Sequence, residues 1–399
     1  MQGIEIIDKI GSGSYGDVFK AYDSKKNVYR AVKLFKQTYS SVKKCMKLPE
    51  VKIMTKVKHE NIVPLKKVIY ENSKLYLVME LCPMNLGMLF EEKRAKKEHF
   101  SEKDIKKYIK DIIKGTECLH KHGYMHRDLK PENILVSEDD KLKLTDFGTI
   151  KSTKDKLSMT HYVSTRWYRA PEWILEVEKY DEKSDVFAVG CILAEFFTLK
   201  PIFCGSSSRD QLLRYLKAMG IKQIDEWKEG SDQFKKLWID TSSYNAPELS
   251  KMIPNTSESA LDLITKMLSL DPTKRPSLKE VLNHQFFKNE TIVSNSTSAS
   301  NLRKLPKLTK ITISRIEDSE GSPCSKDSTA DTYDQYDNSA RVLIKNQLNS
   351  KINQLHQLDL SRVAETDGES SFDCTQIKHE IEKPDVQKSR FNQTNNNTR

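Results

Sequence analysis

The sequence predicts an α+β fold with two lobes: a small strand-rich N-terminal lobe, a larger helical lobe, and then a long tail of different character. Residues 1–80 show mostly strand patterns with one helix, and helical spacing dominates from about residue 101. Apolar density falls sharply after Phe286 and Phe287. We therefore place the folded region at residues 1–288, with lobes of about 1–81 and 82–288, and the tail at 289–399.

The first strands flank a glycine-rich turn. An apolar stretch from Ile4 to Ile10 precedes Gly11-Ser12-Gly13-Ser14-Tyr15-Gly16, and Val18 opens a second apolar stretch. Glycines let a backbone close over phosphates without side-chain clashes. Alone the pattern is weak, and as a dinucleotide-binding fingerprint it would need a helix next, whereas Asp17–Tyr22 is predicted to be a strand.

A lysine follows in the next strand. Ala31-Val32-Lys33 places it between two apolar runs. A lone lysine in a strand is more often solvated at a sheet edge. Its position after the glycine turn favours a phosphate-binding role instead.

Residues 126–148 hold the most specific pattern. His126-Arg127-Asp128-Leu129-Lys130-Pro131-Glu132-Asn133 brings a carboxylate, a lysine and an amide within six residues. Asp146-Phe147-Gly148 adds a second carboxylate after a short predicted strand, Leu142–Thr145. Together they supply a base for a hydroxyl group, a contact for a transferred phosphate and two ligands for magnesium.

Helices are predicted over residues 101–122, 183–198 and 258–269. Ser101 and Asp104 are spaced as in a capping box, and the apolar residues from Ile105 to Ile113 follow helical spacing. The most apolar stretch, Val186–Ala194, is too short to cross a bilayer, so we expect no membrane segment. The first residues show no signal-peptide or myristoylation pattern.

Composition narrows the function classes further. The chain carries 66 basic and 56 acidic residues, a net charge of +10, and the first 288 residues alone carry +11. We interpret this charge as a solvated lysine-rich surface and expect no direct binding of nucleic acid. Seven cysteines without a CxxC pair argue against a disulfide framework or a zinc site and fit a reducing, cytoplasmic setting. Lys93-Arg94-Ala95-Lys96-Lys97 resembles a nuclear-import patch and leaves a nuclear location open.

The tail is predicted to be mostly disordered. Ser, Thr, Asn and Gln make up 43 of its 111 residues, and it holds no tryptophan, so it cannot bury enough apolar surface to offset its ordering entropy. Within residues 341–360, Ile344, Leu348, Ile352 and Leu355 recur at helical spacing. A docking helix and a transient helix without a partner remain equal alternatives there.

These motifs resemble a eukaryotic protein kinase over residues 4–287. The segment Thr160-His161-Tyr162-Val163-Ser164-Thr165-Arg166-Trp167-Tyr168-Arg169-Ala170-Pro171-Glu172 is typical of the MAP-kinase and cyclin-dependent-kinase group and is closest to the RCK branch, with its male germ cell-associated and long-flagella-type kinases. The resemblance implies a two-lobed protein-kinase fold, with an antiparallel sheet and an αC helix in the small lobe. It implies a monomeric enzyme that uses ATP and Mg²⁺ to phosphorylate Ser or Thr followed by Pro in protein substrates. Only the family suggests a cilium or flagellum.

The resemblance also assigns roles by position. Asp128 is expected to accept the hydroxyl proton, Lys130 to contact the transferred phosphoryl group, and Asn133 with Asp146 to hold magnesium. Lys33 is expected to bind the α- and β-phosphates, paired with Glu50 of the αC helix. The expected nucleotide site is Ile10, Gly11, Gly13, Gly16, Val18, Ala31, Lys33, Met79, Glu80, Cys82, Leu135 and Asp146. Val18, Ala31 and Leu135 would sandwich adenine, Met79 would be the gatekeeper, and Glu80 and Cys82 the hinge. The regulatory set is Thr160, Tyr162, Arg127, Arg166 and Arg169, while Asp185 and Arg275 are expected to be structural.

Two positions depart from the group. Pro49 and Lys151 stand where arginine is usual, so Arg127 alone remains of three arginines that clamp a phosphothreonine. Either Pro49 is the first residue of a shortened αC helix, or it kinks that helix and misplaces Glu50, and we favour the first. We expect phosphorylation of Thr160, by an upstream kinase, to activate this chain less than its relatives.

Two alternatives remain beside an active proline-directed kinase. A kinase-fold scaffold with weak catalysis would usually lack Lys33, Asp128 or Asp146, and all three are present. A cyclin-dependent enzyme would be expected to carry a PSTAIRE-like sequence, which Lys43–Lys58 does not show.

Overall fold

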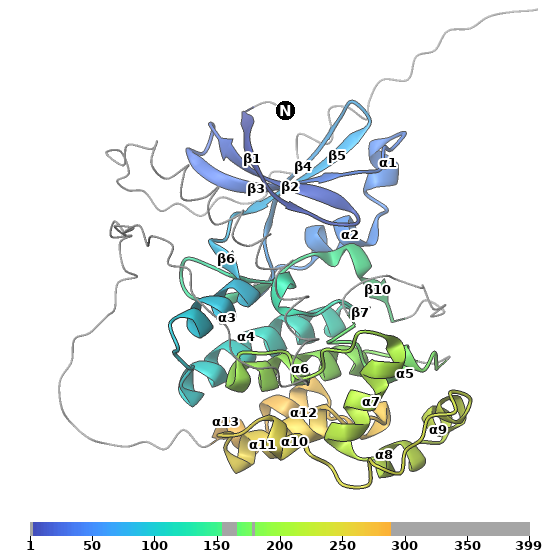
Figure 1. Ribbon diagram of the computed structural model, residues 1–399. Coiled ribbons are helices and arrows are strands. Elements are labelled where there is room, and N and C mark those ends of the chain that lie inside the picture. Colours follow the sequence, from blue (N-terminus) through green and yellow to red (C-terminus); the bar gives the residue numbers. More distant parts are fainter. Residues whose placement is uncertain (1–2, 154–165, 178–179, 289–399) are drawn as a thin grey trace, which may run out of the picture. The chain divides into compact units, whose positions relative to one another are not determined.

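The computed structural model describes residues 3–153, 166–177 and 180–288. A five-stranded antiparallel sheet forms the small lobe (Figure 1), in the order β1-β2-β3-β5-β4. Its strands are β1 (Ile4–Ser12), β2 (Gly16–Asp23), β3 (Val28–Phe35), β4 (Leu65–Glu71) and β5 (Lys74–Glu80). The register sets Val18 opposite Lys33 and Ala31 opposite Met79. The strand predicted over Asp17–Tyr22 is confirmed, because it lies within β2.

Two short helices, α1 (Val42–Cys45) and α2 (Pro49–Lys56), follow β3. Ser41 caps α1 by accepting a hydrogen bond from the Lys44 amide. Pro49 is the first residue of α2, where proline loses no hydrogen bond because the amides of the first turn have no partner within the helix. The interpretation that we favoured, a shortened helix, is therefore confirmed. Glu50 is buried in the first turn of α2.

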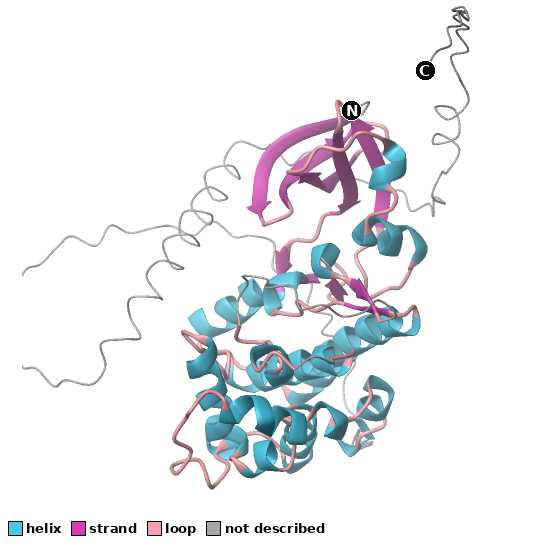
Figure 2. Ribbon diagram, turned by 90° about the vertical axis from the view of Figure 1, so that its right-hand side faces the viewer, coloured by secondary structure: helices cyan, strands magenta, loops and turns pink. Residues whose placement is uncertain are grey.

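The larger lobe is helical (Figure 2), and its two longest described helices have 20 and 16 residues. In α4 (Glu102–Lys121) Ser101 caps the first turn at 3.1 Å from the Asp104 amide, and one apolar face is buried. Thirteen of the 16 residues of α6 (Lys183–Thr198) are buried, which explains its uninterrupted apolar sequence. The predictions of these two helices, and of α11 (Glu258–Met267), are confirmed.

Shorter elements complete this lobe. Its remaining helices are α3 (Leu86–Ala95), α5 (Pro171–Ile174), α7 (Ser208–Met219), α8 (Lys222–Asp225), α9 (Lys228–Lys235), α10 (Leu249–Met252), α12 (Leu278–Leu282) and α13 (Gln285–Lys288). Short 3-10 turns are η1 (Pro131–Asn133), η2 (Phe147–Thr149) and η3 (Pro272–Lys274). Strands β6 (Met84–Asn85), β8 (Ile134–Val136) and β9 (Leu142–Leu144) form one small sheet, and β7 (Tyr124–Met125) pairs with β10 (Lys151–Ser152).

Backbone hydrogen bonds tie β9 to the small lobe. The Leu144 amide donates to the Asn61 carbonyl, and the Val63 amide donates to the Leu144 carbonyl, both at 2.9 Å. Gly115 permits this approach, because a Cβ atom there would lie only 2.6 Å from the Asn61 oxygen. Asp146 lies two residues after the end of β9, so these bonds help to fix its position relative to β3.

Several predictions concern residues outside the described ranges. They include the regulatory positions Thr160 and Tyr162 and the whole tail with its helical spacing at 341–360. Among the described residues, no helix is both long and apolar enough to span a membrane.

Candidate active site

One buried lysine joins three elements of the fold. Lys33 of β3 lies with its Nζ atom 2.7 Å from Oε1 of Glu50 in α2 and 2.9 Å from Oδ1 of Asp146, which precedes η2. The side chains of Lys33 and Glu50 are only 7% and 5% exposed, whereas that of Asp146 is 42% exposed. Asp146 is therefore the member of the group that can reach a ligand from solvent.

Charge pairing sets the protonation of Lys33 and Asp146, whereas burial outweighs it at Glu50 and raises the pKa of that carboxyl. Burial by itself would lower the pKa of Lys33, but the two carboxylates outweigh it and the pKa is raised. Burial likewise works to raise the pKa of Asp146, but Lys33 overcomes it and the pKa is lowered. Lys33 is therefore a fixed positive charge and Asp146 a fixed negative one.

A second group lies in the loop between β7 and η1. Oδ2 of Asp128 lies 2.9 Å from Nζ of Lys130 and accepts a hydrogen bond of 2.9 Å from the side-chain amide of Asn133. The same Asn133 nitrogen donates to the Asp128 carbonyl at 2.8 Å. The Asp128 side chain is 9% exposed and that of Lys130 is 17% exposed. The loop therefore holds a carboxylate and an ammonium group side by side at its surface.

Asp185 of α6 fixes the backbone of this loop by hydrogen bonds. Its carboxylate accepts hydrogen bonds of 2.9 Å from the amides of His126 and Arg127 and lies 2.9 Å from Nε2 of His120. Burial works to raise its pKa, but His120 and the other donors lower it. Arg127 has a φ of 70°, a left-handed conformation that costs free energy for a residue with a Cβ atom. The bonds to Asp185 hold the backbone there, so the structural role expected of Asp185 is confirmed.

The glycine turn packs closely on its neighbours. The Gly13 amide donates to the Gly16 carbonyl at 2.9 Å, which closes the turn. A Cβ atom on Gly16 would lie 2.4 Å from the Leu34 carbonyl oxygen, so only glycine fits. The ring of Tyr15 reaches Gly148, where an added Cβ atom would lie 2.5 Å from it. The tip of the turn therefore contacts the segment that carries Asp146.

The expected adenine residues come from both lobes. Ala31 and Met79 are buried in neighbouring strands, and Leu135 lies in β8 opposite Asn85. The Glu80 carboxylate binds Nζ of Lys143 at 2.7 and 2.9 Å. Burial raises the pKa of the Cys82 thiol to about 12, so it stays neutral. Of the remaining expected residues, Ile10 and Gly11 lie in β1, where Ile10 is exposed, and Val18 lies in β2.

The residues present fit a nucleotide with magnesium. Asn133 uses its amide nitrogen for both hydrogen bonds to Asp128, which leaves its oxygen for a cation. Asp146 adds an exposed carboxylate, and magnesium prefers oxygen ligands of this kind. In the glycine turn an added Cβ atom would clash at Gly16, 2.4 Å from the Leu34 carbonyl oxygen, whereas at Gly11 and Gly13 it would make only ordinary contacts.

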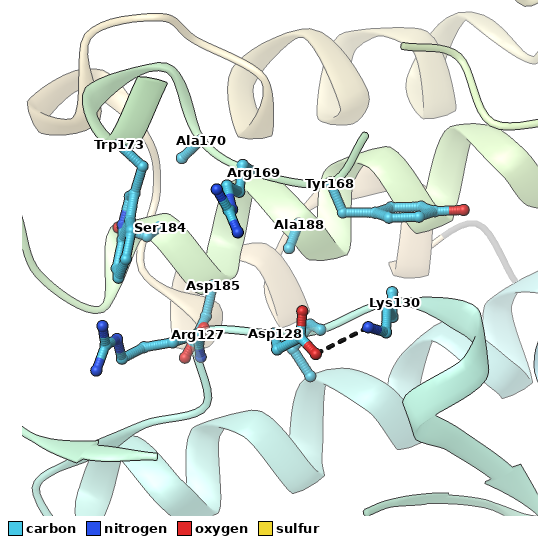
Figure 3. A pocket seen from close by; sticks show the side chains of 11 residues that line it. Arg127, Asp128, Lys130, Tyr168, Arg169, Ala170, Trp173, Ser184, Asp185 and Ala188 are labelled. Atoms are coloured by element: carbon cyan, nitrogen blue, oxygen red, sulfur yellow. Dashed lines mark hydrogen bonds and ion pairs between the residues drawn. The ribbon is translucent and has the colours of Figure 1, made fainter. Parts of the chain in front are cut away.

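The activation-segment arginines lie beside the catalytic loop. Arg169 lines the same pocket as Arg127 and Asp128 (Figure 3). Its amide donates to the Arg166 carbonyl at 3.0 Å, and its carbonyl accepts from the Tyr215 hydroxyl. The structural role expected of Arg275 is confirmed: it pairs with Glu172, and both are buried, with contacts of 2.7 and 2.6 Å.

Sequence reasoning missed two parts of this site. Trp173 and Ser184 line the pocket beside Arg127. Tyr168 lines it too, and its hydroxyl donates to the buried carboxylate of Glu195 at 2.6 Å. Trp173 lies in a helix of four residues just after the activation-segment motif, and Glu195 follows the apolar stretch Val186–Ala194, so neither residue belongs to a motif.

A paired lysine and glutamate, a magnesium-type ligand pair and a carboxylate beside a lysine define a phosphoryl-transfer site of the protein kinase class. Residues 4–287 match the family described as protein kinase domain. The chain is 38% identical to cyclin-dependent kinase F-3 of Oryza sativa subsp. japonica over 305 residues, which is 76% of this chain and 70% of that protein. The chain belongs to the protein kinase family.

Further relatives indicate the branch. Serine/threonine-protein kinase ICK of Mus musculus is 38% identical over 285 residues, or 71% of this chain and 44% of that protein. Serine/threonine-protein kinase MAK of Mus musculus is 36% identical over 288 residues, or 72% of this chain and 46% of that protein. The match thus covers less than half the length of these two relatives. The chain is a serine/threonine kinase of the MAP-kinase and cyclin-dependent-kinase group, and the resemblance to the RCK branch is confirmed.

Proposed function

We propose that this kinase transfers the γ-phosphate of ATP to Ser or Thr followed by Pro in protein substrates, and that Thr160 and Tyr162 regulate it, with a smaller gain from phosphate on Thr160 than in its relatives. The observation that carries the proposal is the arrangement around Nζ of Lys33. Carboxylate oxygens of Glu50 and Asp146 both lie within 3 Å of that nitrogen atom. A site lacking this alignment would need a partner or a modification to complete it.

Each charged residue has a distinct task in this proposal. Asp128 orients the substrate hydroxyl and accepts its proton, and its bond to Asn133 sets the carboxylate angle. Lys130 contacts the phosphoryl group in transfer, and Lys33 neutralises the α- and β-phosphates. Asn133 and Asp146 would hold magnesium, which when bound neutralises charge on the phosphates. Alignment and charge, rather than a covalent intermediate, supply the catalysis.

The preference for proline after the target residue is inferred from the activation segment. The resemblance assigns it to Arg169 with the Val163–Trp167 segment. Arg169 lines the same pocket as Asp128, which supports a role in placing the residue after the phosphorylated one. Regulation by Thr160 and Tyr162 rests on the segment's sequence alone.

A direct assay tests the proposal. The full chain is purified and given ATP, magnesium and two peptides that differ only in Pro or Ala after the target serine. Asp146→Asn should abolish transfer, and Asp240→Asn, the same change at an exposed carboxylate outside the site, should not. We expect at least about tenfold faster transfer to the Pro peptide, and equal rates would refute the proline preference.

The same assay separates the alternatives. A wild-type chain that binds ATP without transferring phosphate would favour the scaffold. Transfer that begins only when a cyclin is added would favour the cyclin-dependent enzyme. The ion pair between Lys33 and Glu50 favours neither, because it is formed here by the chain alone.

A further inference from the structure

The catalytic loop has an aromatic neighbour that the kinase motifs do not include. The guanidinium carbon of Arg127 lies 4.7 Å from the centre of the Trp173 ring and 5.9 Å from that of Tyr180. Figure 3 shows the Trp173 indole and the Arg127 side chain on the same side of the pocket. A guanidinium group over an indole is attracted by the negative face of the ring.

The indole is itself held in place. Nε1 of Trp173 donates to the Ser184 hydroxyl at 3.0 Å, and that hydroxyl donates to Oε1 of Glu172 at 3.0 Å. Glu172 is the buried partner of Arg275, and the side chains of both are fully buried. The Tyr180 ring packs on Trp173 with 4.2 Å between centres. A rotation of the indole would therefore break a hydrogen bond that leads to the core ion pair.

The guanidinium group in turn connects two parts of the site. Nη1 of Arg127 donates to the Thr149 carbonyl at 3.3 Å, and the Thr149 hydroxyl donates to the His126 carbonyl at 2.9 Å. These bonds link the catalytic loop to the turn that follows Asp146. Arg127 also directly precedes Asp128, at a backbone position with a φ of 70°. A shift of the guanidinium group would therefore act on Asp128.

We propose that Trp173 is a positioning residue, whose indole holds Arg127, and through it Asp128, in the active arrangement without a phosphate on Thr160. The inference rests on the role proposed above for Asp128. It would also offset the missing arginines at Pro49 and Lys151, because a loop arginine supported by an aromatic ring depends less on a full phosphate clamp. Trp173 touches neither substrate nor the reacting atoms in this proposal.

The test compares two substitutions at one position in the full chain. Trp173→Leu keeps an apolar side chain but removes the ring face, and Trp173→Phe keeps a ring face but removes the bond to Ser184. We expect kcat to fall about tenfold in the leucine variant, which corresponds to about 1.4 kcal/mol of barrier, and less than about threefold in the phenylalanine variant. KM for ATP should stay within about twofold of wild type, because Trp173 lies outside the expected nucleotide site.

A matched control separates positioning from loss of stability. Trp227 is a buried tryptophan in the segment between α8 and α9, away from the site, whereas Trp173 is partly buried. Trp227→Leu should lower the melting temperature at least as much as Trp173→Leu and leave kcat unchanged. Thr160→Ala should lower kcat of the wild type less than about threefold.

Four outcomes would overturn the inference. The first two are an unchanged kcat in Trp173→Leu and equal losses of kcat in the leucine and phenylalanine variants. The third is a loss of kcat in Trp227→Leu as large as in Trp173→Leu, and the fourth is a loss of kcat of more than about tenfold in Thr160→Ala. Wild-type protein that transfers no phosphate would refute the proposed catalytic roles themselves, and the inference would fall with them. Activity in wild type with no loss in Trp173→Leu would refute the inference alone.

Discussion

Proline at the first position of α2 should have little effect on the free energy of unfolding, whereas a proline in the next turn of the same helix should lower it. Pro49→Ala should change the free energy of unfolding by less than about 1 kcal/mol, because the amide at the first helical position has no partner to lose. Lys52 is exposed, and its amide donates to the Leu48 carbonyl at 2.9 Å. Lys52→Pro removes that bond and crowds the carbonyl, which costs about 3 kcal/mol or more.

Activity should follow the same order, since α2 carries Glu50. Phosphate transfer by Pro49→Ala should stay within about threefold of wild type, whereas Lys52→Pro should lose at least about tenfold. Lys52→Ala controls for the loss of charge and should behave as wild type. Urea unfolding followed by tryptophan fluorescence, beside peptide phosphorylation, measures both quantities. A gain of more than about tenfold in Pro49→Ala would show that the proline misplaces Glu50 and that our account of the helix is wrong.

Three further predictions concern buried charge and thiols. Arg275→Met should destabilise the fold by about 3–5 kcal/mol, because it leaves Glu172 buried and unpaired. Adding Glu172→Gln should recover part of that loss. A double variant that is no more stable in urea than the single variant would contradict this. Burial raises the pKa of Glu195 from 4.5 to about 8, so the folded state keeps a proton that the unfolded chain releases. Stability should therefore fall as pH rises between those values, by at most about 1.4 kcal/mol per pH unit, and melting curves of Glu195→Gln at pH 6 and pH 8 should show a smaller fall than wild type. The Cys82 thiol has a pKa of about 12, so it should react with iodoacetamide at pH 7 far more slowly in folded than in unfolded protein. Mass spectrometry of the labelled peptide would measure both rates, and equal rates would argue against burial of the thiol.

Elements with strong local signals could be predicted from the sequence. The helix after Ser101 has a cap and a sustained apolar spacing, and α6 has a long apolar sequence, so both were found with nearly correct ends. The four-residue helices α5, α8 and α10 are too short to show a helical period. Their position is set by packing in the lobe rather than by local preference.

The residues of the site also fall into those that a local motif predicts and those that no motif predicts. Motif spacing indicated Lys33, Asp128 and Asp146, although the first and the last are 113 residues apart, because each lies in a recognisable local pattern. The contact between Arg127 and Trp173 has no such pattern, and neither does the buried pair of Tyr168 and Glu195. Contacts of this kind depend on how residues 166–177 pack against α6, and no local sequence pattern predicts that packing.

The junction at Lys33 affects the choice of an inactive variant for experiments in cells. Replacing this lysine is a common way to silence a kinase, but here it would leave the carboxylates of Glu50 and Asp146 without their shared cation in a mostly buried site. Such a protein would lose the connection between β3, α2 and η2 as well as its chemistry. Its effect in a cell would then mix lost catalysis with altered shape and abundance. Asp128 pairs with Lys130 and Asn133 and lies outside the junction of β3, α2 and η2, so a change at Asp128 would give the cleaner comparison.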